Sequence, residues 1–122
     1  MKKILFIDED PFMFMIVPKI LENENVEIVP VDDGQLGYEM GRSENFDLII
    51  LCYGLPSKYG TDICRDLRKD GITTPILFIA DTPIEDGKFI RKELDLEFGA
   101  TDYIHKPFDP VKFLAKIKTL LV

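Results

Sequence analysis

The sequence has few cysteines and no long apolar run. Its only cysteines, Cys52 and Cys64, cannot form the disulfide framework of a small secreted domain and are typical of a reducing compartment. The longest stretch without a charged residue, Leu48–Ser57, falls far short of the roughly 20 apolar residues that cross a bilayer. Eight glycines and eight prolines are spread along the chain, which excludes a low-complexity sequence.

Positive charge is scarce as well. Fifteen lysines and arginines stand against 22 aspartates and glutamates, so the formal net charge is −7, and the basic residues form no run. A direct role of this domain in nucleic-acid binding is therefore disfavoured, and proteins, cations or small ligands are the expected partners. The length of 122 residues and the 46% hydrophobic share predict a single domain over residues 1–122.

The N-terminus imitates a signal peptide only briefly. Lys2 and Lys3 precede the apolar run Ile4–Ile7, but the acidic triplet Asp8–Asp10 ends that run at once. We therefore expect a strand at this position, a cytoplasmic protein and no membrane association.

Short apolar runs rich in β-branched residues alternate with stretches of helical length. The runs predict five strands: Ile4–Ile7, Val26–Val31, Leu48–Cys52, Ile76–Ala80 and Tyr103–His105. The stretches between them predict five helices: Pro11–Glu24, Gln35–Ser43, Thr61–Lys69, one within Ile84–Phe98, and Pro110–Leu121, with Asp10, Asp33 and Asp109 as N-caps. Because the third and fourth runs lack alternation, they indicate strands covered on both faces. The pattern predicts an α/β, doubly wound parallel sheet with its sites at the carboxyl ends of the strands.

Charged residues follow the first and the last predicted strands. Asp8, Glu9 and Asp10 end the first strand, and clustered carboxylates of this kind suit magnesium or calcium. The alternative is that Asp10 only caps a helix and the other two acids are solvated. Lys106 precedes Pro107 after the last strand, which disfavours helical geometry for the lysine and leaves a cis bond open.

Five sequence blocks stand in order along the chain: Ile4–Pro11, Asp47–Leu51, Leu55–Pro56 with Gly60, Thr74–Leu77 and Gly99–Phe108. Together they closely resemble the receiver domain of bacterial two-component response regulators, over Lys2–Leu121. The resemblance implies a CheY-like sheet of five parallel strands in the order 2-1-3-4-5 with five helices. It also implies a role in phosphorelay signal transduction, in which an aspartate at the end of the third strand accepts a phosphoryl group from a histidine kinase.

The resemblance carries several functional positions onto matching residues. The family's acidic pair falls on Asp8 and Glu9, its pocket lysine on Lys106 and its switch aromatic on Tyr103. No cofactor is required on this interpretation. Asp8, Glu9 and a main-chain carbonyl near Gly54 could still hold Mg²⁺ or another divalent cation weakly.

Two positions that handle the phosphoryl group in the family differ here. Cys52 stands at the phosphoacceptor position, and Ala80 stands where the family has Thr or Ser. An acyl phosphate needs a carboxylate nucleophile, and a thiol suits softer metals than magnesium. We therefore expect a degenerate receiver that is not an enzyme and that acts by protein recognition without phosphorylation.

Other functions stay open at this point. The chain could still be phosphorylated on Cys52 or on a nearby aspartate, Asp8 or Asp10, or Cys52 could be a thiol redox sensor. Flavin-binding proteins share the topology, but the acidic triplet stands where a phosphate cradle would be needed. Cys64 is expected only to pack.

The first predicted helix suggests where a partner binds. Its apolar residues are consecutive from Phe12 to Val17, so Phe14 and Met15 could form an exposed protein interface. The alternative is that a helix kinked at Pro18 buries them. Residues 81–87 lengthen the loop before the fourth helix relative to the family. A histidine kinase, another signalling protein, an output domain of the same protein and a second copy of the chain are the candidate partners.

Overall fold

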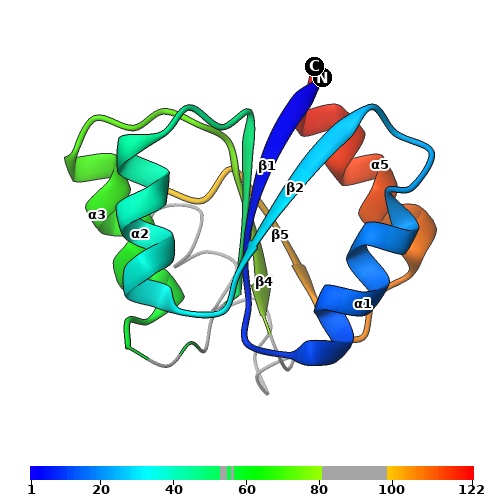
Figure 1. The fold of residues 1–122 in the computed structure, drawn as a ribbon, viewed down its shortest axis with the longest axis horizontal. Coiled ribbons are helices and arrows are strands. Elements are labelled where there is room, and N and C mark those ends of the chain that lie inside the picture. The colour runs from blue at the N-terminus through cyan, green and yellow to red at the C-terminus, as the bar shows by residue number, and fades with distance from the viewer. Residues whose placement is uncertain (53–54, 56, 81–98) are drawn as a thin grey trace.

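The computed structural model describes residues 1–52, 55, 57–80 and 99–122. Five strands form one parallel sheet in the order β2-β1-β3-β4-β5 (Figure 1). They are β1 Lys2–Ile7, β2 Val26–Val31, β3 Leu48–Cys52, β4 Ile76–Ala80 and β5 Asp102–His105. The predicted doubly wound sheet and its strand order are confirmed.

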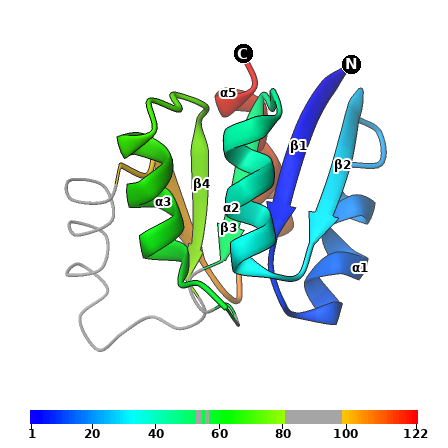
Figure 2. The same ribbon diagram turned by 60° about the vertical axis from the view of Figure 1, so that its left-hand side comes forward.

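Helices cover both faces of this sheet. The described residues contain α1 Pro11–Ile20, α2 Gly34–Ser43, α3 Gly60–Lys69 and α5 Pro110–Leu120. Figures 1 and 2 show α2 and α3 on one face and α1 and α5 on the other. The helix predicted within Ile84–Phe98 and the loop at residues 81–87 lie outside the described residues. In the described part of the chain, no helix has the length and apolar character of a membrane span.

The predicted N-caps explain where three of the helices begin. Asp10, Asp33 and Asp109 each accept a main-chain N–H bond of 2.8–3.0 Å from the first turn of α1, α2 and α5. Each carboxylate satisfies a donor that the helix itself leaves unpaired. The cap prediction is therefore confirmed at all three positions.

Helix α1 ends earlier than the sequence predicted. It stops at Ile20 rather than Glu24, two residues after Pro18, which lies inside the helix. Leu21 is 2% exposed and fits into the core, and the N–H of Glu24 then bonds to the Leu21 carbonyl in a turn. The chain has to reverse here because β2 begins at Val26, and this tertiary requirement outweighs the helical pattern of the segment.

The core has two layers, one on each face of the sheet. Leu5, Ile7, Ile49 and Leu51 pack with α3 on one face, and Ile4, Phe6, Leu48 and Ile50 pack with α1 and α5 on the other. Every residue of β3 and β4 is buried, as their unbroken apolar runs predicted. Burial of a large side chain of this kind contributes about 1.5–3 kcal/mol, so the central strands hold the carboxyl edge rigidly in place.

Candidate functional site

The carboxyl ends of the strands bring the predicted site residues to one edge of the sheet. The register pairs Ile7 with Leu51 and Cys52 with Ile79, so Asp8 and Cys52 follow neighbouring residues of β1 and β3. At the other side of the site, the main-chain N–H of Lys106 bonds to the Ala80 carbonyl at 2.9 Å. Four residues that are distant in the sequence therefore end four adjacent strands.

Asp8 is the buried charge of this edge. Its side chain is fully buried, and its Oδ1 accepts main-chain hydrogen bonds from Glu9 at 2.7 Å and from Asp10 at 3.0 Å. Its Oδ2 is buried and has no hydrogen-bond partner in the part of the chain that the structure describes. Because a buried carboxylate is costly without compensation, the other groups around Oδ2 determine what the site can do.

Lys106 supplies that compensation. Its Nζ lies 3.5 Å from Asp8 Oδ2 and 3.7 Å from Asp10 Oδ2, and the Lys106 side chain is 17% exposed. The Lys106–Pro107 bond is cis, the conformation that the sequence left open. The ammonium thus joins the chain after β5 to the chain after β1, while Glu9 stays exposed at the rim.

Cys52 and Ala80 occupy the centre of the edge as apolar groups. Cys52 is 1% exposed and belongs to the core layer that faces α3, and Ala80 is 7% exposed. Neither side chain carries an oxygen atom. Gly54, the third member of the predicted cation site, lies outside the described residues.

A divalent cation does not find a complete site among the described residues. The buried Asp8 Oδ2 is the kind of oxygen that a hard cation prefers, and Glu9 is adjacent in the chain. However, Cys52 offers sulfur where a third oxygen would be needed. Within the described residues, no group of three or more His, Cys, Asp and Glu side chains is arranged to hold a metal ion. Among the described residues, Lys106 is thus the cation that balances the Asp8 carboxylate.

The loop that follows β3 is fastened to α2. Ser57 Oγ donates to Asp33 Oδ1 at 2.6 Å and accepts from the main-chain N–H of Gln35 at 2.9 Å. The Ser57 hydroxyl, with the Leu36 main-chain N–H, holds the pKa of Asp33 below its usual value. A Cβ atom on Gly34 would lie 2.3 Å from the Lys58 carbonyl oxygen, so a glycine is needed at this contact. The sequence predicted only a capping role for Asp33 and carried no signal for its bond to Ser57.

Tyr103, the predicted switch aromatic, is half-buried on β5. Its ring packs against the core layer on the α3 side of the sheet, and Lys116 Nζ lies 5.8 Å from the ring centroid. The structure places Tyr103 on the strand that ends at His105, directly before Lys106. It therefore lies on the strand that leads directly into the pocket lysine.

The predicted interface on α1 divides into two environments. Phe14 is half-buried, and its ring meets Phe6 edge-to-face with centroids 5.2 Å apart. Met15 is 66% exposed. Phe12, which the sequence did not single out as an interface residue, is 57% exposed. Phe12 lines a pocket of about 460 Å³ together with Lys106 and Phe108, so an apolar depression adjoins the charged edge.

The family comparison agrees with this geometry. The model of the response regulator receiver domain matches residues 4–118. The response regulator ArlR of Staphylococcus saprophyticus is 36% identical over 121 residues, which are 99% of this chain and 53% of ArlR. The chain spans about half, or less, of the length of the relatives it matches.

Solved structures give the same answer for the fold. The BeF3-activated N-terminal receiver domain of Klebsiella pneumoniae RstA is 32% identical, with a TM-score of 0.84 and 98% of both chains covered. The receiver domain of the Francisella response regulator 1452 has a TM-score of 0.86 at 22% identity, and the match covers 99% of this chain and 97% of that one. At that lower identity the likeness concerns the fold alone.

Proposed function

Because this chain belongs to the response regulator receiver domain family, we propose that it is a receiver without the phosphoryl switch, which acts by binding other signalling proteins. The observation that carries the proposal is Cys52, buried at the carboxyl end of β3 where the family's acceptor aspartate stands. The proposal concerns this domain, whatever further domains accompany it.

The chemistry of phosphoryl transfer supports the proposal. Formation of an acyl phosphate requires a carboxylate that attacks phosphorus and a divalent cation that offsets the charge of the transferring group. Cys52 provides no carboxylate, and its sulfur is a poor ligand for magnesium. Ala80 provides no hydroxyl that could bond to a phosphoryl oxygen and draw the switch region inward. As far as the described residues go, the site therefore lacks both the acceptor and the group that reads its modification.

Lys106 is already engaged by acids of the same edge. Its distances of 3.5 Å to Asp8 and 3.7 Å to Asp10 give the ammonium two anionic neighbours without any phosphoryl group. We propose that this remnant of the site serves as an anchor that holds the loop after β1 against the loop after β5. Such an anchor keeps one arrangement of the edge, which suits a module that binds partners constitutively.

Asp8 is poorly placed as an alternative acceptor. Asp8 is fully buried and already accepts two main-chain hydrogen bonds on Oδ1, so attack on a phosphoryl donor would first require the edge to open. The redox alternative concerns Cys52, and it gains little support because Cys52 is 1% exposed and a redox-sensing thiol has to be accessible. Cys64 is no better suited, because burial raises the pKa of its thiol to about 11 and the thiolate is the reactive form. Cys52 and Cys64 are both buried, and within the described residues neither forms a disulfide.

The test is incubation of the protein with acetyl phosphate or phosphoramidate and Mg²⁺, followed by intact mass spectrometry. We expect no adduct, whereas a receiver with an aspartate at this position, treated in parallel, should gain about 80 Da per phosphoryl group. Hydroxylamine treatment of any adduct distinguishes the two acceptors, because a phosphocysteine, unlike an acyl phosphate, would survive mild hydroxylamine. A stoichiometric adduct on the wild-type chain would contradict the proposal, and its hydroxylamine sensitivity would identify the acceptor as carboxylate or thiol.

A further inference from the structure

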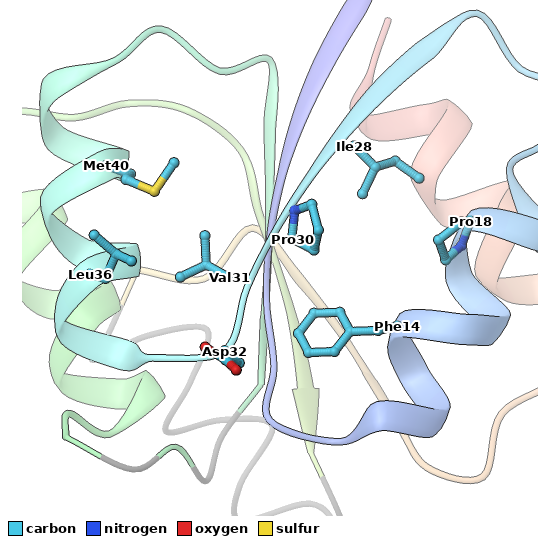
Figure 3. A pocket seen from close by; sticks show the side chains of 8 residues that line it. All are labelled: Phe14, Pro18, Ile28, Pro30, Val31, Asp32, Leu36 and Met40. Carbon is cyan, nitrogen blue, oxygen red and sulfur yellow. The ribbon is translucent and has the colours of Figure 1, made fainter.

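The open edge of the sheet at β2 forms an apolar groove of about 560 Å³. Figure 3 shows Phe14, Pro18 and Ile28 on the α1 side of β2, and Leu36 and Met40 on the α2 side. Leu36 is 52% exposed. The strand is thus the floor of a groove whose two walls are apolar and come from different helices, and Asp32 stands at its end.

The main chain of β2 faces outward at alternate residues. The carbonyls of Asn25 and Val31 accept from Lys2 and Asp8, which follows the pairing with β1. Main-chain N–H and carbonyl groups alternate in direction along a strand. The main-chain groups of Val26, Ile28 and Pro30 therefore point away from β1 and toward the open edge. The N–H of Val26 is bonded to the Glu24 carbonyl, and proline has no N–H. Within β2, all of which is described, the outward edge therefore offers the N–H of Ile28 and the carbonyls of all three residues.

The charged side chains that the β2 segment itself contributes are all acidic, although Lys118 of α5 lies 4.0 Å from Glu24. Residues 22–33, which include β2 and the turns on both sides of it, contain Glu22, Glu24, Glu27, Asp32 and Asp33 and no basic residue. An edge rich in carbonyl acceptors and flanked by carboxylates favours an occupant that brings hydrogen-bond donors and positive charge. Apolar walls on both sides favour an occupant whose alternate side chains point to opposite faces, as those of a strand do.

We propose that the β2 edge docks an extended, basic segment of a partner protein by strand addition. The segment pairs with Ile28, places alternate side chains against the α1 and α2 walls, and brings an Arg or Lys to Asp32. This mode obtains affinity from the main chain and selectivity from the side-chain contacts. It rests on the proposed role in protein recognition and assigns a surface and a partner chemistry to that role.

A second copy of this chain fits the edge less well. Antiparallel pairing of two β2 strands about Ile28 would bring Glu24 of one copy opposite Asp32 of the other, and each copy carries a net charge of −7. Like charges placed opposite one another on paired strands are destabilising. A basic segment from another protein avoids this repulsion.

The test uses the full chain and a fluorescent, acetylated and amidated peptide, Arg-Val-Thr-Ile-Thr-Val-Arg, whose near-symmetric sequence fits either strand direction. One control peptide has Pro in place of the central Ile, and a second has Glu in place of both Arg. The protein variants are Leu36→Asp in the α2 wall and Asp32→Lys at the end of the groove. Val111→Asp is the matched control, because Val111 is 75% exposed and lies in the first turn of α5, outside the groove.

We expect saturable binding of the basic peptide and slower hydrogen exchange at the Ile28 amide in its presence. Leu36→Asp and Asp32→Lys should each weaken binding about tenfold, while Val111→Asp and the wild type bind equally and neither control peptide binds. The inference is overturned if no binding saturates below about 1 mM, if both groove variants bind normally, or if the acidic peptide binds as well. Concentration-dependent dimerisation abolished by Leu36→Asp would also overturn it, in favour of a second copy. The phosphorylation test is independent of these outcomes, so the two proposals fail separately.

Discussion

The Lys106 ammonium lies 3.5 Å from the buried Oδ2 of Asp8, an oxygen for which the described residues supply no hydrogen-bond donor. This pair connects the ends of β1 and β5 across the strands between them. Because the Asp8 side chain is fully buried, the pair is screened by solvent far less than the other ion pairs of the described residues. Its removal is therefore the clearest test of how the edge is held together.

Replacement of Lys106 by methionine should destabilise the fold. Lys106→Met keeps the length of the side chain but leaves the Asp8 carboxylate buried without its cation, and we expect a loss of about 2–3 kcal/mol in the free energy of unfolding. Urea denaturation at pH 7 measures this loss. Lys116→Met is the matched control, because its pair with Asp102 is one-third exposed and should cost only about 0.5 kcal/mol. Equal losses in the two variants would show that the Asp8 pair is not special.

A carboxylate at position 52 should restore phosphorylation. Cys52→Asp places an acceptor beside Asp8, Glu9 and Lys106, so with acetyl phosphate and Mg²⁺ we expect a gain of about 80 Da. Without Mg²⁺ the added buried charge should lower the melting temperature, and Mg²⁺ should raise it again. Cys52→Ser, which supplies a hydroxyl of similar size, should give neither effect. A Cys52→Asp protein that remains unmodified would mean that the edge has lost more than its acceptor.

The Cys64 thiol should make stability fall at alkaline pH. Burial raises its pKa in the folded protein from 9.0 to about 11. Above pH 9 the unfolded chain releases this proton and the folded chain retains it, so the stabilising contribution is complete below pH 9 and is lost as the pH rises towards 11. Unfolding free energies of the wild type and Cys64→Ala between pH 8 and 11 check this. The advantage of the wild type should shrink by about 2 kcal/mol across that range, and a constant difference would contradict the assigned cause.

Two glycines of α2 should respond in opposite ways to alanine. Gly34→Ala places a methyl group against the Lys58 carbonyl, so the loop after β3 has to move, and we expect a loss of about 2 kcal/mol. Gly41→Ala meets only ordinary contacts of 3.4–3.5 Å with Leu67 and Leu5, and the better helix propensity of alanine should stabilise by up to about 1 kcal/mol. Thermal unfolding of the two variants distinguishes these outcomes, and tolerance of Gly34→Ala would show that the loop contact is loose.

The sequence alone determined the architecture of this protein, because each local signal points to one structure. The unbroken apolar runs of β3 and β4 require cover on both faces, and Asp10, Asp33 and Asp109 start helices. Such signals depend only on neighbouring residues, so they can be read without coordinates. The predicted end of α1 was wrong because the real end depends on where β2 has to begin.

Contacts between distant residues were decided only by the tertiary structure. The choice of Asp8 and Asp10 as neighbours of Lys106, and the bonds from the Arg68 guanidinium to the Ile72 carbonyl at 2.7 Å and the Gly99 carbonyl at 3.0 Å, have no local signal. The β2 groove is of the same kind, since Phe14 predicted a surface but not its second wall at Leu36 and Met40. The physical reason is that a side chain's partner is set by strand order and register, which bring together residues that the chain keeps far apart.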